Sequence, residues 1–347
     1  MAAATTTTMT MTMKLPAGPR RRAAMVAATV TALSGMVVAG QAIAQSATAA
    51  YPSRALRMIA PFPPGGGTDQ LARTFAAQIA EGLGQPVTVE NRAGAGGNLG
   101  AEATAKATPD GYTIMLTSNS LVINAALYQK LTYNVRTDIA PLALVASAPL
   151  VVLVHPSLPM KNMKDLVAWA KRSKGGLNFG TNGAGTSGHL SGELLRLSAG
   201  IGMTHIPYKG AVPMMTALMG GDLDMGITTA PSALPLVRAG RLRALAVTTP
   251  NPAKTLPGID PIAATFPGYS MDIWYGIFAP GGTPAPIQER LVAEVRKSHG
   301  SSSVRAALER DGADPVFLGG SEFVQFFIRD LDKYIKLVKQ AGVRAEQ

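Results

Sequence analysis

The chain has 347 residues, which is enough for two domains. It is 47% hydrophobic and only 5% aromatic, with 37 glycines and 25 prolines. This composition is typical of an α/β protein with many glycine-containing turns. It contains no cysteine, which excludes disulfides, thiolate metal sites, a cysteine nucleophile and a lipid-modified N-terminal cysteine. The net charge is +11, but the basic residues are scattered, which argues against a nucleic-acid surface and leaves anionic small molecules as compatible ligands.

Residues 1–44 have the three parts of a secretory signal peptide. A polar and then basic start is followed by an apolar run of small residues at 23–40, and cleavage after Ala44 or Ala49 fits the A-x-A pattern. The alternative is an uncleaved anchor, because the run approaches spanning length. Without the four basic residues of the leader, 28 basic and 21 acidic residues remain, a net charge of +7. The mature chain is therefore expected in the periplasm.

The stretch 58–79 reads as a strand, a glycine loop and a helix. Prolines within 61–64 end the strand, and glycines 65–67 allow positive φ and a close approach to a ligand. Thr68 or Asp69 is expected to cap the helix. The amides at such a helix N-terminus attract anions, although a tight turn without a ligand is the alternative.

Two further loops follow strands in the first part of the chain. The expected elements are strands at 87–90 and 112–116, a glycine loop at 91–98, a helix at 99–107 and a polar loop at 117–120. Strands that alternate with helices predict a parallel sheet with right-handed crossovers. Ligands of such sheets lie beyond the carboxyl ends of the strands, where the loops are expected.

A second set of alternating elements follows. Strands are expected at 150–154, 177–180, 203–207, 223–227 and 244–248, and helices at 163–172, 189–198, 212–219 and 232–239. A strand at 273–279 is expected to return to the first set, and helices follow up to 298, at 304–310 and at 322–339. We therefore expect one lobe from 51–152 and 277–347, a second lobe inserted at 153–276, and two crossover segments at a hinge that suits closure over a ligand.

The glycine loop at 183–188 matches G-x-G-x-x-G, but no acidic residue stands about 20 positions further on, as a dinucleotide site requires. No H-E-x-x-H motif or close histidine pair supports a metal site. His189 follows the glycine loop and is expected to position it, because no nucleophile is evident nearby. The sequence thus predicts no catalytic residue, no metal and no cofactor.

Several motifs in chain order resemble those of the Bug family, the substrate-binding proteins of tripartite tricarboxylate transporters. They are PFPPGGGTD at 61–69, ENRAGAGG at 90–97, PDGYT at 109–113, GTSGHL at 185–190, PYKG at 207–210, PSALP at 231–235 and APGGTP at 279–284. The resemblance implies a two-lobed periplasmic binding protein of type II, without enzymatic activity, that captures a small organic acid and delivers it to membrane transporter subunits. A monomer is expected.

The resemblance also implies which residues bind the ligand, partly through ordered water. They are Phe62, Gly66, Gly67, Thr68, Asp69, Ser118, Asn119, Asn182, Gly183, Thr186, Ser187 and Thr228. Many family members carry Asp-Asn where this chain has Thr228-Thr229, which makes an amino-acid ligand less favoured than an acid without an amine. Leu121 also replaces a histidine common in the family. The remaining alternatives are a receptor that presents its ligand to a membrane sensor and, less favoured, an exported hydrolase.

Overall fold

The computed structural model describes residues 51–128 and 130–341, so the expected signal peptide lies outside the described part of the chain. The strands are β1 (Leu56–Ala60), β2 (Val87–Asn91), β3 (Thr113–Ser118), β4 (Ile139–Val154), β5 (Leu177–Thr181), β6 (Met203–Pro207), β7 (Met225–Thr229), β8 (Arg243–Val247), β9 (Asp272–Pro280) and β10 (Asp314–Gly319). The helices are α2 (Gly67–Leu83), α3 (Asn98–Ala105), α4 (Ser120–Leu127), α5 (Met163–Arg172), α6 (Ser187–Ala199), α7 (Ala211–Gly220), α8 (Ala230–Arg238), α9 (Ala285–Gly300), α10 (Ser302–Asp311) and α11 (Ser321–Ala341). Short 3₁₀ turns lie at Ala95–Gly97 and Ile262–Ala264.

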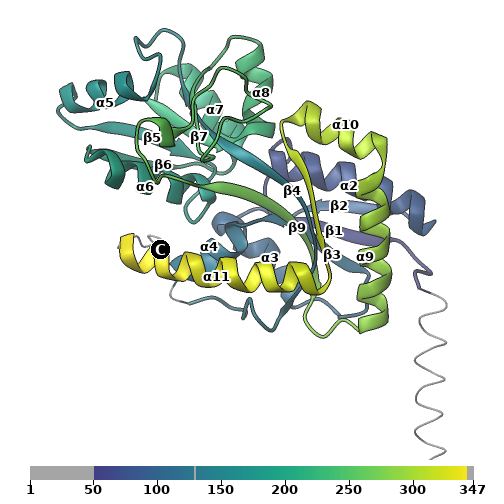
Figure 1. The fold of residues 1–347 in the computed structure, drawn as a ribbon. Coiled ribbons are helices and arrows are strands. Elements are labelled where there is room, and N and C mark those ends of the chain that lie inside the picture. The colour runs from purple at the N-terminus through teal and green to yellow at the C-terminus, as the bar shows by residue number, and fades with distance from the viewer. Residues whose placement is uncertain (1–50, 129, 342–347) are drawn as a thin grey trace, which may run out of the picture. The chain divides into compact units, whose positions relative to one another are not determined.

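The long strand β4 connects two groups of strands (Figure 1). Its residues 139–149 pair antiparallel with β9, and its residues 150–154 pair with β7 and β8. The pairs β1–β2, β1–β3, β5–β6 and β5–β7 are parallel, as the alternation of strands and helices predicts. The strand β9 returns the chain to the first group, because it pairs with both β3 and β4.

The two groups differ from the expected elements mainly around β4. The helix at 163–172 and the strand at 203–207 are confirmed at both ends. The polar loop expected at 117–120 is wrong, because β3 continues to Ser118 and α4 begins at Ser120, which leaves Asn119 alone between them. The first part of β4, the helix α4 and the strand β10 were not predicted.

The helix α2 follows the first glycine loop and anchors it on the core. The helical spacing of its apolar residues predicts a buried face, and this is confirmed, since Leu71, Phe75, Ile79 and Leu83 are all buried. The expected cap is wrong: the N-cap residue is Gly66, and Thr68 and Asp69 lie inside the first turn. The side chain of Asp69 serves the loop in another way, which is described below.

The helix α11 packs against α4 and β4 (Figure 1). The apolar spacing of this helix predicts that one face lies on the core, formed by Phe323, Phe327, Leu331, Ile335 and Val338. All are buried except Ile335, which is 42% exposed, so the prediction is wrong at that position. Trp274 of β9 packs edge-on against Phe323 and donates its indole N–H to Asp330 Oδ2 at 2.7 Å. Trp274 therefore fills the space between β9 and α11.

Candidate ligand-binding site

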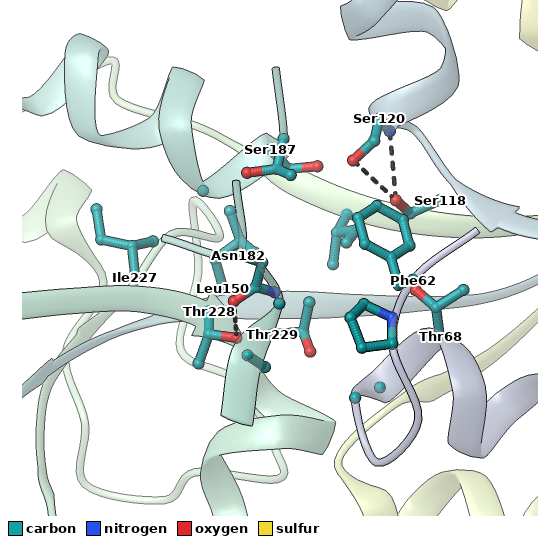
Figure 2. Close-up of a pocket in the computed structure, with 18 residues that line it drawn as sticks. Phe62, Thr68, Ser118, Ser120, Leu150, Asn182, Ser187, Ile227, Thr228 and Thr229 are labelled. Atoms are coloured by element: carbon teal, nitrogen blue, oxygen red, sulfur yellow. Dashed lines mark hydrogen bonds between the residues drawn. The ribbon is translucent and has the colours of Figure 1, made fainter. Parts of the chain in front are cut away.

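A pocket lies where several strands end and several helices begin. It has a volume of about 30 Å³. The residues that line it are Phe62, Pro63, Gly66, Gly67, Thr68, Ser118, Ser120, Leu150, Asn182, Thr186, Ser187, Gly188, Gly210, Ala211, Ile227, Thr228, Thr229 and Ile273. Figure 2 shows Phe62 and Thr68 on one side of the pocket, with Asn182, Ser187 and Thr228 on the other. Segments far apart in the sequence therefore meet around one small space.

The glycine loop before α2 is held in shape by the carboxylate of Asp69. Its Oδ2 accepts the Gly65 amide at 3.0 Å, and its Oδ1 accepts Asn91 Nδ2 at 2.9 Å. The same Asn91 nitrogen also donates to the Phe62 carbonyl, and Arg73 pairs with Asp69 from the next turn of α2. Burial raises the pKa of Asp69, but the hydrogen bonds from Arg73, Gly65 and Asn91 outweigh it and place the pKa below its ordinary value. Asp69 is thus a charged loop anchor that does not line the pocket.

The glycine loop before α6 is closed by its own hydroxyls. Thr186 caps α6 by accepting the His189 amide, and its hydroxyl donates to the Gly183 carbonyl at 2.7 Å. The Gly185 amide donates to His189 Nδ1 at 3.3 Å, which confirms that His189 positions this loop. Gly183 and Gly185 have φ of +140° and +76°, which an L side chain rarely adopts.

The ring of His189 stacks on His205 with centroids 4.0 Å apart. His205 Nε2 lies 2.7 Å from Thr181 Oγ1, at the base of the second loop. Burial, and then the neighbouring His189, lower the pKa of His205 to about 3. At neutral pH the ring of His205 is therefore uncharged and serves as a packed support for the loop.

Asn119 is fully buried between β3 and α4 and joins four parts of the chain. Its side-chain nitrogen Nδ2 donates to the Asp272 carbonyl at 2.8 Å and to the Tyr334 hydroxyl at 3.0 Å. Its Oδ1 accepts the Ser187 hydroxyl at 2.6 Å. This network ties the start of α6 to β9 and α11, so Asn119 supports the pocket wall from behind.

The direction of the hydrogen bonds shows which side chains remain available to a ligand. Ser118 donates its hydroxyl to Ser120, and Thr228 donates its hydroxyl to Asn182 Oδ1 (Figure 2). The hydroxyl hydrogen of Ser120 and the amide nitrogen of Asn182 are consequently left to donate. The hydroxyl of Thr68 has no hydrogen-bond partner among the described residues. The pocket thus offers three side-chain donors.

Backbone amides add to these donors because helices begin at the pocket. The lining residues Thr68, Ser187, Gly188 and Ala211 belong to the first turns of α2, α6 and α7, where an amide has no acceptor within its helix. The positive ends of these helix dipoles favour negative charge in the same space. No ionisable side chain of the described residues lines the pocket. The arrangement can therefore hold an anionic group with neutral donors alone.

Most of the residues expected at the site line this pocket. Three of the expected residues do not line it. Asp69 and Asn119 support its wall from behind, and the carbonyl of Gly183 closes the second loop. It adds Ser120 and Thr229, polar residues that follow Asn119 and Thr228 in the sequence. Both lie directly beside residues that the sequence did indicate.

Within residues 51–128 and 130–341, no three His, Asp or Glu side chains are grouped so that they could hold a metal ion. None of the helices in this part of the chain is long and apolar enough to cross a membrane.

Comparison with known proteins agrees with this architecture. Residues 71–343 match the model of the tripartite tricarboxylate transporter family receptor. Protein BugT of Bordetella pertussis is 35% identical over 317 residues, which cover 90% of this chain and 97% of BugT. The solved structure of the periplasmic binding protein BugD has a TM-score of 0.82 at 30% identity and covers 85% of this chain and 100% of BugD.

Two similar structures were solved with an organic acid. Rhodopseudomonas palustris Rpa4515, with adipate, has a TM-score of 0.79 at 35% identity, covering 85% of this chain and 99% of Rpa4515. MatC from the same organism, with bound malate, has a TM-score of 0.76 at 30% identity, covering 83% of this chain and 100% of MatC. The fold is thus that of the periplasmic binding proteins. The chain belongs to the tripartite tricarboxylate transporter receptor family, of which BugT and BugD are relatives.

Proposed function

We propose that this chain is a periplasmic receptor that captures the carboxylate of a small organic acid and delivers the acid to membrane transporter subunits. The observation that carries the proposal is the group of unpaired donors around one uncharged pocket: Thr68, Ser120, Asn182 and the first-turn amides of α2, α6 and α7. A carboxylate presents lone pairs to each of them, and water can bridge the donors that it does not reach directly.

The two groups of strands that meet in β4 support a hinged, two-lobed receptor. We propose that 51–152 and 277–347 form one lobe, with 153–276 inserted as the other. The pocket then lies between the lobes, since Phe62 and Thr68 come from the first segment and Asn182 and Ser187 from the insertion. Closure would bring the two glycine loops onto opposite sides of the ligand.

The side chains at the pocket favour an acid without an amine and favour binding over catalysis. No Asp or Glu of the described residues lines the pocket to pair with an ammonium group. The pocket serines donate to Asn119 or pair with each other, and His189 accepts the Gly185 amide, so these groups are arranged as loop supports and not as a nucleophile with its base. We therefore propose a receptor, acting as a monomer, that leaves its ligand unchanged.

A calorimetric screen of organic acids tests the proposal. Each acid is paired with its primary amide, which has nearly the same shape but no charge. We expect at least one acid to bind and its amide to bind much more weakly, because helix dipoles favour the anion. Silence across a broad panel of acids, or equal binding of acid and amide, would refute carboxylate capture.

A further inference from the structure

Two buried asparagines near the start of α4 contact the glycine loop at 183–188. Asn119 precedes the helix and is 0% exposed, and Asn124 lies in its second turn and is 1% exposed. Asn119 Oδ1 accepts the Ser187 hydroxyl at 2.6 Å. Asn124 Oδ1 lies so close to Gly185 that a Cβ on this glycine would overlap it. The loop therefore rests on α4 at two points.

The bond between Ser187 and Asn119 joins the two proposed lobes. Ser187 begins α6 in the insertion at 153–276, whereas Asn119 lies between β3 and α4 in the segment 51–152. The backbone amide of Asn119 donates to the Trp274 carbonyl at 3.0 Å, which holds Asn119 on β9 beside β3. A hinge motion that moves α6 away from α4 would break the Ser187 bond and keep the bond to β9. The Ser187 bond is therefore a property of the closed form.

The orientation of the Asn119 side chain is fixed by partners outside the glycine loop. Its Nδ2 donates to the Asp272 carbonyl of β9 and to the Tyr334 hydroxyl of α11. Because a carbonyl can only accept, Nδ2 must face β9 and Oδ1 must face Ser187. The Tyr334 hydroxyl donates in turn to the sulfur of Met271 at 3.4 Å. The acceptor that Ser187 meets is therefore in place before the lobes close.

Ser187 lines the pocket, but its hydroxyl hydrogen is not available to a ligand. A serine has one such hydrogen, and Ser187 donates it to Asn119. Toward a carboxylate in the pocket, the Ser187 oxygen presents only lone pairs, which do not attract an anion. The side chain of Ser187 thus contributes to closure and not to direct capture.

The position of Asn124 indicates that closure also has a cost. Its Nδ2 donates to the Gly96 carbonyl at 2.9 Å, but its buried Oδ1 has no hydrogen-bond partner among the described residues. Water can reach this oxygen when the loop at 183–188 moves away, so closing costs the free energy of one hydrogen bond to water. An interlobe hydrogen bond and a bound acid can offset this cost and shift the population toward the closed form.

We propose that Ser187 and Asn119 form a latch that holds the two lobes closed over the bound acid and slows its release. Asn119 is a positioning residue in this latch, since it acts on the acid only through Ser187 and α6. The proposal rests on the proposed function, because it assumes hinged lobes that close on a carboxylate. The acid must enter before the lobes close, so loss of the latch should change the dissociation rate and leave the association rate nearly unchanged.

The test compares Ser187→Ala with Ser191→Ala, a matched control on the same helix. Ser191 is fully buried, and its hydroxyl lies 2.6 Å from that of Tyr269, so its bond stays within the insertion. The chain has no cysteine, so fluorophores on Glu81→Cys and Lys171→Cys, two exposed positions on different proposed lobes, report closure by energy transfer.

Stopped-flow mixing with the acid that binds most tightly in the calorimetric screen gives both rates. We expect Ser187→Ala to raise the dissociation rate about tenfold, because the mutation removes one hydrogen bond and leaves Asn119 Oδ1 buried without a donor. Ser191→Ala should lower the melting temperature and leave the dissociation rate unchanged. Tyr334→Phe should give a smaller increase in the dissociation rate, although Tyr334 does not line the pocket, because the Asn119 side chain loses one of its supports.

The outcomes separate this inference from the proposed function. An unchanged dissociation rate in Ser187→Ala would overturn the latch and leave carboxylate capture standing. A faster rate in Ser187→Ala without any effect of Tyr334→Phe would reduce Ser187 to a wall of the pocket and would also overturn the latch, as would an energy-transfer signal that does not respond to a bound acid. Silence of every acid would overturn the proposed function and the latch with it. Circular dichroism verifies that each variant is folded.

Discussion

Replacing Gly96 with alanine should weaken ligand binding by separating the two glycine loops. Gly96 lies in the loop between β2 and α3 with a φ of +63°. A Cβ on Gly96 would overlap the carbonyl oxygen of Ala184 in the second loop, closer than the 3.0 Å that real Cβ atoms keep. Because that oxygen belongs to the backbone, rotating a side chain cannot relieve the overlap.

Gly84→Ala is the matched control. Gly84 has a similar φ of +66° at the C-terminus of α2, and a Cβ there would meet nothing within 4 Å. Each alanine lowers the free energy of unfolding by about 1 kcal/mol or somewhat more, because it must adopt the left-handed conformation. Only Gly96→Ala must also move the loops apart, by about 1 Å to reach ordinary contact distance. Overpacking of this kind costs about 1–3 kcal/mol, which corresponds to a 5- to 150-fold weaker ligand affinity if the loops must touch in the bound state.

Isothermal titration with the best-binding acid measures the dissociation constant, and thermal denaturation measures the stability of each variant. We expect Gly84→Ala to lower the melting temperature without changing the dissociation constant. Gly96→Ala should lower the melting temperature by a comparable or larger amount and raise the dissociation constant as well. Equal affinities of the two variants would show that the contact between Gly96 and Ala184 is not part of the bound state, and the reasoning would be refuted.

Three further predictions concern the loops and their supports. Asn182→Ala removes one donor and should weaken acid binding about tenfold. Asn182→Asp places a negative charge against the ligand and should weaken binding further. An Asp variant that binds better than the Ala variant in calorimetry would contradict the proposed pocket. Asp69→Asn should lower the free energy of unfolding measured in urea at neutral pH, and because the pKa of Asp69 lies below 3.8, the difference from the unaltered protein should shrink as the pH falls through that folded pKa. The pKa of His205 is about 3 in the folded state and 6.5 in the unfolded state, so below pH 6.5 only the unfolded state takes up a proton. The contribution of His205 to stability is therefore complete above pH 6.5 and declines as the pH falls, by up to about 2 kcal/mol at pH 5. His205→Gln should flatten the pH dependence of the free energy of unfolding over this range, and an unchanged slope would exclude His205 as its source.

The sequence predicted those elements best whose periodicity is clear. The helix at 163–172 has Leu166 and Ala170 buried on one face, and its bounds were predicted without error. The strand β4 was recognised only from residue 150 onward. Its first part, IAPLALVASAP, contains prolines and alanines that disfavour a strand by propensity, and it is stabilised instead by pairing with β9 and β10. Such tertiary pairing cannot be read from the local sequence.

The sequence indicated the loops that line the pocket but not the direction in which each polar side chain points. Asp69 and Asn119 are as polar as Thr68 and Ser120, yet each is turned toward the protein by partners that come from other elements. Asn91 lies 22 residues from Asp69, and Tyr334 lies 215 residues from Asn119. Hydrogen bonds over such separations depend on the completed fold, and for this reason a support and a ligand contact look alike in the sequence.

The donors of the proposed site differ from an arginine clamp in how they are held. The hydroxyl hydrogens of Ser118, Thr186 and Thr228 are already used inside the protein, so these residues fix the walls and face the cavity only with lone pairs. A carboxylate must therefore find the remaining donors, which are backbone amides and three short side chains. Such groups lose few rotamers on binding, whereas each long cationic side chain would lose several. The glycine loops and their buried supports thus serve the same end, because they fix the donors before the ligand arrives.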